Sequence, residues 1–177
     1  IEWTVNEMPF IEKGPHAGIS GAGMVVVDGR IYLAGGFIPA GDETQEASRR
    51  TSRWTHRFDP KTNQWTRLPD LPARREYTRA TSSGHSVYVL GGAIQGRPTL
   101  PSADVYLLDA SQSPLQWRTA PPMTVARSHL SVGVVGSQLI AAVGNKYDIA
   151  EKGYSQHTIQ GLTERLDLHN LEKGWQT

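Results

Sequence analysis

A glycine doublet that recurs three times constrains the fold of this chain more than any other feature. It appears as Gly35-Gly36, as Gly91-Gly92 and, in a weaker form, as Gly144-Asn145, each time after a short run rich in β-forming residues. Each copy is followed by an aspartate and then by a tryptophan: Asp59 and Trp65, Asp109 and Trp117, Asp167 and Trp175. A fixed order at a steady period indicates a repeat architecture, in which each unit packs against its neighbours.

Each unit is predicted to contain four short antiparallel strands, lettered a to d in chain order. In the first unit the pattern places them over residues 22–27, 31–34, 53–58 and 64–67, with Asp28-Gly29 as a two-residue hairpin turn between the first two. Gly84-His85 and Gly136-Ser137 occupy the matching turn in the other copies. β-Branched and aromatic residues fill the strands and no helical apolar period is sustained, so the chain is expected to be all-β.

The connections between units repeat as well. A tryptophan strand runs into a proline-containing loop, and an arginine follows, Arg74 in one copy and Arg127 in the next. Both stand the same number of residues before their glycines, and the first copy has Gly18 at this position. We therefore align Arg74 with Arg127.

These residues resemble the kelch repeat. The resemblance rests on the glycine doublet, the aromatic residue three positions before it, the Asp59-Pro60 turn and the tryptophan of the outer strand. The third copy departs from the pattern at Asn145 and Ala141. The resemblance implies a kelch-type β-propeller with three four-stranded blades, half of a six-bladed ring. Its segments are an outer strand of a preceding blade plus a linker (1–17), the first blade (18–72), the second blade (73–124) and a degenerate third blade (125–177).

Three blades would leave two apolar faces in water, so the ring is expected to need a second half-propeller. That half is either a second copy of this chain or the remainder of a longer or cleaved polypeptide. Glu2-Trp3-Thr4 resembles Gln64-Trp65-Thr66, so the chain is expected to open on an outer strand whose blade it lacks, as it closes on another at Trp175. The extra strand favours a fragment or cleaved chain over a native half-propeller.

Charge and composition exclude several classes of function. The chain has 18 Lys and Arg against 17 Asp and Glu, so it has no overall basic field for nucleic acid. Its longest apolar runs are far shorter than the roughly 18 residues of a membrane span, and no charged-then-apolar leader opens it. No cysteine occurs, and the six histidines have no metal-ligand spacing, so neither a metal nor another cofactor is expected. Soluble locations inside and outside the cell both remain open.

The resemblance also implies where a site would lie. In kelch folds the d-to-a and b-to-c loops emerge on the same face, which commonly holds the binding site. The b-to-c loops here, at 37–52, 93–102 and 146–161, are long, and loops of this length tend to be functional. The candidate ligand-binding residues come from the d-to-a loops: Arg74, Arg75, Tyr77, Arg79, Arg127 and His129. Clustered guanidinium groups suit carboxylate, sulfate or phosphate recognition, so an acidic ligand is inferred.

Two kinds of function follow from this arrangement, and a purely structural role stays open beside them. The first is a binding module that captures an acidic glycan or peptide; in the ubiquitin-ligase adaptors that the chain resembles, arginine at the aligned position meets acidic peptides. The second is a sugar mutarotase or epimerase, as in the sialic-acid epimerases that it resembles, with Glu76 and His129 as an acid-base pair. Alternatively, Arg74 and Arg127 have a purely structural role, in which their aliphatic chains pack on neighbouring blades and their guanidinium groups pair with carboxylates.

Overall fold

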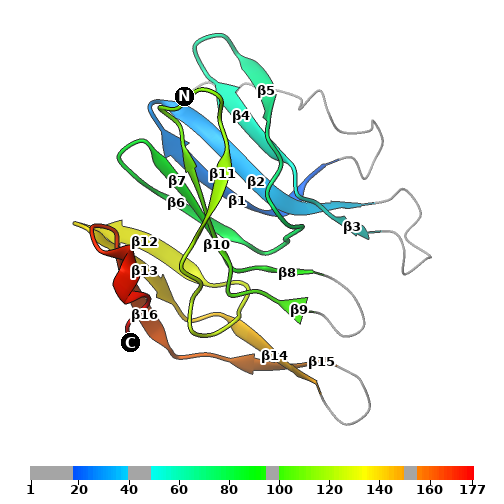
Figure 1. Ribbon diagram of the computed structural model, residues 1–177. Helices are drawn as coiled ribbons and strands as arrows, with labels where there is room; N and C mark the ends of the chain where they lie inside the picture. Colours follow the sequence, from blue (N-terminus) through cyan, green and yellow to red (C-terminus); the bar gives the residue numbers. More distant parts are fainter. Residues whose placement is uncertain (1–17, 40–48, 95–99, 150–154) are drawn as a thin grey trace, which may run out of the picture.

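The computed structural model describes residues 18–39, 49–94, 100–149 and 155–177, so the expected outer strand at 1–17 lies outside the described residues. The described part is built from three larger antiparallel sheets that follow one another along the chain, with two separate two-stranded sheets between their strands (Figure 1). The first sheet has the order β1 (Ser20–Val27), β2 (Arg30–Pro39), β4 (Thr55–Asp59) and β5 (Gln64–Leu68), with β3 (Arg49–Thr51) paired to the end of β2. The all-β prediction is confirmed.

The second sheet repeats this order, and the third repeats it in part. The second contains β6 (Arg79–Ser83), β7 (Ser86–Leu90), β10 (Val105–Asp109) and β11 (Trp117–Ala120). The third contains β12 (Ser131–Val135), β13 (Gln138–Ala142) and β16 (Thr163–Asp167). Where a fourth strand was expected, the third sheet has a short 3-10 helix, η1 (Leu171–Lys173), and a single bridge between Arg165 and Gln176.

Two-residue turns join the first two strands of every sheet, as the sequence predicts. Val27 pairs with Arg30 across Asp28-Gly29, whose φ values of 49° and 71° are both positive. Positive φ at both central residues matches the right-handed twist of the flanking strands, and Asp-Gly is a favoured pair for such a turn. Gly84 and Gly136 provide the positive φ in the other two turns.

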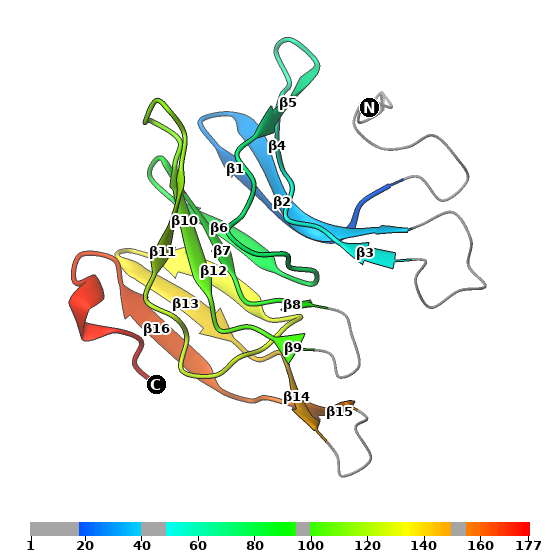
Figure 2. The same ribbon diagram turned by 45° about the vertical axis from the view of Figure 1, so that its right-hand side comes forward.

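The b-to-c segments form hairpins that point to one side of the molecule (Figure 2). The end of β2 forms such a hairpin with β3, and the other two are β8 (Ala93–Ile94) with β9 (Leu100–Pro101), and β14 (Asn145–Ile149) with β15 (Ser155–Ile159). The d-to-a linkers approach the base of these hairpins, since Glu76 bridges Ala93 and Ser128 bridges Asn145. We call this end of the molecule the loop face.

Apolar side chains fill each junction between successive sheets. At the first junction, buried residues of the first sheet such as Tyr32 and Leu68 pack with Val89 and Leu108 of the second. At the second junction, Leu90 and Val105 of the second sheet pack with Leu139 and Leu166 of the third. Each sheet of a junction thus contributes one of its two faces to a shared core.

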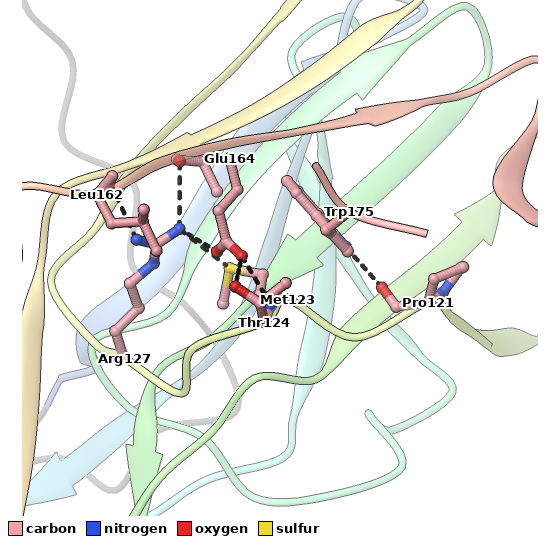
Figure 3. Close-up of polar contacts among 8 residues, drawn as sticks. Pro121, Met123, Thr124, Arg127, Leu162, Glu164 and Trp175 are labelled. Carbon is pink, nitrogen blue, oxygen red and sulfur yellow. Dashed lines mark hydrogen bonds and ion pairs between the residues drawn. The ribbon is translucent and has the colours of Figure 1, made fainter. Parts of the chain in front are cut away.

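The outer tryptophans seal the two junctions, as expected. Trp117 is 7% exposed and its indole N–H donates to the carbonyl of Pro69, at 3.0 Å, in the linker that follows the first sheet. Trp175 is 8% exposed and donates in the same way to Pro121, at 2.8 Å (Figure 3). Each ring adds apolar contact area while its polar edge is satisfied by a main-chain carbonyl.

The backbone hydrogen bonds give an alignment of the repeats that differs from the one predicted from the sequence. Gly35 and Gly91 have φ values of 72° and 59°, and each donates its N–H across to the c segment. In the third sheet Val143 makes the equivalent hydrogen bond, to Leu162, and has φ 52°. The third doublet is therefore Val143-Gly144, not Gly144-Asn145.

Candidate functional site

The linker arginines are the first residues whose roles the structure separates. Gly36 donates its N–H to the carbonyl of Arg75, and Gly92 donates to that of Arg127, so Arg75 and Arg127 are equivalent. The alignment of Arg74 with Arg127 is therefore wrong by one residue, and Arg74 corresponds to Ala126. The same shift places Ile19, not Gly18, at the arginine position of the first sheet.

Arg127 lies inside the protein. Its side chain and that of Glu164 are both 0% exposed, and Arg127 Nη2 is 2.6 Å from Glu164 Oε2 (Figure 3). The guanidinium also donates to the carbonyls of Leu162 and Ala141, at 3.1 and 3.2 Å, while Glu164 accepts hydrogen bonds from the backbone and side chain of Thr124. Burial lowers the pKa of Arg127 and Glu164 opposes this effect, and an arginine in such a network stays charged.

Arg75 makes the corresponding contact in the second sheet. It is 7% exposed and forms an ion pair with Asp104, which also accepts a hydrogen bond from the Tyr106 hydroxyl at 2.9 Å. Burial alone would raise the pKa of Asp104, but hydrogen bonds from Ser102, Tyr106 and Arg75 lower it. Burial raises the pKa of Tyr106 to about 12, so this hydroxyl stays protonated and donates. Arg75 and Arg127 thus fasten linkers to sheets. For Arg127 this is the structural role that was the alternative to ligand binding, whereas Arg74 is exposed and makes no ion pair among the described residues.

Tyr77 and His129 form the most distinctive feature of the loop face. They occupy equivalent positions, one residue after the bridges of Glu76 and Ser128, and their rings stack with centroids 4.0 Å apart and an interplanar angle of 25°. Phe37 of the first hairpin contacts Tyr77 at a centroid distance of 5.9 Å. Both rings are half-buried, so they also present a surface to solvent.

The backbone at these two positions is strained. Tyr77 has φ 52° and His129 has φ 55°, in the left-handed region that costs a non-glycine residue about 1–2 kcal/mol. The equivalent residue of the first sheet is Gly21, with φ 64°, which pays no such cost. Two aromatic residues held where glycine would fit better favour a functional reason for the side chains.

Glu76 lies close to this pair in sequence but not at the surface. Its side chain is 2% exposed, and one carboxylate oxygen is 3.5 Å from the Thr51 hydroxyl. His129 has its Nδ1 2.9 Å from the Ser128 hydroxyl. Among the described residues, Glu76 contacts Thr51, and His129 contacts Ser128 and the Tyr77 ring.

The remaining arginines of the predicted set are the ones open to a ligand. Arg79 begins β6, is half-buried, and donates to the carbonyl of Thr78 at 3.0 Å. Arg74 is exposed and lines a separate cavity beside the first hairpin. Across the described ranges neither makes an ion pair.

Sequence reasoning missed Phe37 and the cavity residues Arg53 and Trp54. Phe37 directly follows the first glycine doublet, so its aromatic side chain could have been recognised from the sequence as a candidate for the loop face. The described residues hold no group of histidine, aspartate and glutamate side chains arranged to bind a metal ion. Among them there is also no helix with the length and apolarity to cross a membrane.

Comparisons with known proteins agree with this architecture. Residues 19–72 match the family model of the kelch motif. Kelch-like protein terF of Aspergillus terreus is 35% identical over 144 residues, covering 81% of this chain and 29% of that protein. Kelch-like protein 38 of Homo sapiens is 38% identical over 86 residues, covering 48% of this chain and 14% of that protein. The solved structure of YjhT has a TM-score of 0.73 at 17% identity, covering 92% of this chain and 56% of that one.

The fold is that of a β-propeller, since successive antiparallel sheets pack face to face around a shared inner edge and a solved propeller superposes on them. The chain belongs to the kelch-repeat family, and the predicted resemblance is confirmed. It spans less than a third of the length of the curated relatives named above and 56% of the solved propeller.

Proposed function

We propose that this chain is part of a binding module whose loop face recognises an acidic ligand, either a glycan or a peptide. Kelch repeats generally form protein-binding propellers, which supports a binding role. The single observation that carries the proposal is the stacked pair Tyr77 and His129, held on strained backbone and still half-exposed. Arg79, two residues after Tyr77, supplies a positive charge that makes no ion pair among the described residues.

The chemistry of this group suits a ligand with a carboxylate and an apolar or ring-shaped body. Aromatic rings provide flat contact area at low cost in side-chain entropy, and guanidinium binds carboxylate through paired hydrogen bonds. Arg75 and Arg127, which are buried and paired with Asp104 and Glu164, leave the proposed contact set.

The test is binding to arrays of acidic peptides and acidic glycans, comparing the wild type with Tyr77→Gly, His129→Gly and Arg79→Ala. Each variant is expected to weaken binding about tenfold, the loss of one charge-assisted or stacking contact. Glycine relieves about 1–2 kcal/mol of backbone strain and removes about 0.5–1.5 kcal/mol of stacking, so the melting temperature should change little. Arg118→Ala, an exposed arginine on β11, is the matched control. Unchanged binding by all three variants would refute this site.

The sugar mutarotase or epimerase alternative has less support. It requires Glu76 to exchange a proton with a sugar, and the burial of this side chain beside Thr51 gives a sugar little access to it.

A second part of the proposal is that another half-propeller covers the first sheet. Val87, Val89 and Leu108 are buried at the first junction, and the residues equivalent to them in the first sheet are Ile31, Leu33 and Phe58. These three are only half-buried, and no described sheet packs on them. Apolar side chains in this arrangement suit the next sheet of a ring.

Light scattering on the isolated chain distinguishes the two sources of that half. Aggregation or a monomer with an accessible first sheet is expected if the covering sheets belong to a longer polypeptide. A stable particle of twice the chain mass would instead identify a second copy as the partner.

A further inference from the structure

A cavity of about 370 Å³ lies on the loop face on the other side of the first hairpin from the stacked rings. Its lining residues are Ile38, Thr51, Ser52, Arg53, Trp54, Asp70 and Arg74. Phe37 and Ile38 are neighbours in β2, so their side chains point to opposite faces of the hairpin. Phe37 contacts Tyr77, whereas Ile38 lines the cavity, so the cavity is separate from the Tyr77 and His129 pair.

Positive charge is in excess among the described residues around this cavity. Arg53 Nε is 2.9 Å from Asp70 Oδ2, and Arg67 pairs with the other oxygen of the same carboxylate. Arg74 makes no ion pair in the part of the chain that the structure describes. Two guanidinium groups therefore share one carboxylate, and the exposed Arg74 is a third group that is left to bind an anion from solution.

Trp54 gives the cavity a flat aromatic wall. The Arg67 guanidinium lies 4.8 Å from the centroid of its ring, and the Trp54 backbone N–H donates to the Ser52 hydroxyl at 2.9 Å. The indole is half-buried, so part of it remains open to a ligand. The volume is in the lower part of the range of small-molecule sites, enough for a group about the size of one monosaccharide or one side chain.

The second junction shows that the fold does not need these residues. Leu71 N–H donates to the carbonyl of Arg53, and Met123 N–H donates to that of Ala103, so Arg53 corresponds to Ala103. By the same alignment Asp70 corresponds to Pro122, and Arg74 corresponds to Ala126. At these three positions a junction with the same backbone has small or apolar residues, so the fold does not require the charges of Arg53, Asp70 and Arg74.

We infer that this cavity is a binding site for a single carboxylate-bearing group. Arg74 and Arg53 hold the carboxylate, and Trp54 packs against the body that carries it. The inference rests on the proposed function, because it places a second acidic subsite on the same face, but it uses none of Tyr77, Arg79 or His129.

The experiment titrates the whole chain with glucuronate and with N-acetylglutamate, and with uncharged glucose and N-acetylglutamine as controls. The readout is the NMR signal of the Trp54 indole N–H, assigned with Trp54→Phe. We expect the two acids to shift this signal and the two neutral compounds to leave it unchanged. A response to one acid alone identifies the source of the carboxylate as sugar or side chain and still supports the site, whereas no response to either acid overturns it.

Variants separate binding from a merely structural role. Arg74→Ala and Arg53→Ala should each weaken binding about tenfold, while the exposed Arg118→Ala should leave it unchanged. Asp70→Asn removes the carboxylate that competes for Arg53, so binding should become several-fold tighter; weaker binding by this variant, or full affinity in Arg74→Ala, overturns the inference.

Failure of this site can be told from failure of the proposed function. His129→Gly leaves the cavity intact and should keep the Trp54 response. If the wild type shows no Trp54 response but its binding to the arrays still depends on Tyr77 and His129, the cavity site alone is overturned.

Discussion

Replacing Arg127 with alanine is expected to lower the free energy of unfolding by about 3–5 kcal/mol. The reason is the carboxylate left behind, since Glu164 is 0% exposed and would keep only its hydrogen bonds from Thr124. Urea denaturation followed by circular dichroism measures the loss. Arg30→Ala, which breaks the more exposed pair with Asp59, should cost at most about 1 kcal/mol and is the matched control.

A double variant, Arg127→Met with Glu164→Leu, tests the cause of this loss. Removing both charges leaves no buried ion without a partner, so much of the lost stability should return. If the double variant is as unstable as Arg127→Ala, packing and not charge explains the effect. A loss below about 1 kcal/mol in Arg127→Ala would contradict the role of the arginine as a clamp between linker and sheet.

Trp117→Ala is expected to lower the free energy of unfolding by about 3–5 kcal/mol, the usual loss when a large aromatic side chain is removed from a core. Trp117 is 7% exposed, packs in the first junction and donates to Pro69, so its loss leaves both a void and an unsatisfied carbonyl. The same denaturation measurement applies.

Trp65 is the control that the repeat itself provides. It occupies the equivalent position in the first sheet, where it is half-buried and contacts Phe58 at a centroid distance of 5.0 Å. Trp65→Ala should therefore cost only about 1 kcal/mol. If Trp65→Ala and Trp117→Ala lower the free energy of unfolding equally, Trp117 does not seal the first junction in the way described.

The strands and turns were predictable because their signals are local. Alternating β-forming residues and the Asp28-Gly29 turn are sufficient to place β1 and β2 to within a few residues. The third doublet was misplaced because the alignment followed glycine letters, whereas the backbone requirement is a positive φ at the first position. Val143 meets that requirement at φ 52°, a conformation that a β-branched residue rarely adopts and that no sequence pattern announces.

The candidate site was only partly predictable for a related reason. Arg74 and Arg75 are adjacent and identical in the sequence, and only the folded structure shows that Arg75 is buried beside Asp104 while Arg74 is exposed. The burial of Arg127 depends on Glu164, 37 residues further along the chain, and nothing local to either residue reveals the pairing. The cavity at Arg53 and Trp54 likewise needs the hairpin and the linker in place before it exists.

The ion pairs and tryptophan contacts that hold the sheets together also affect how such chains can gain or lose repeats. Residues 75–126 and 127–177 each contain both members of one ion pair, Arg75 with Asp104 and Arg127 with Glu164. The indole N–H groups of Trp117 and Trp175 donate to main-chain carbonyls of the segment before them, at Pro69 and Pro121, and every residue provides such a carbonyl. Trp117 also donates to the Thr55 hydroxyl at 3.2 Å. Gene duplication, deletion or exchange at these boundaries therefore keeps the two partners of each of these ion pairs together, and any new neighbour offers a main-chain carbonyl to the tryptophan.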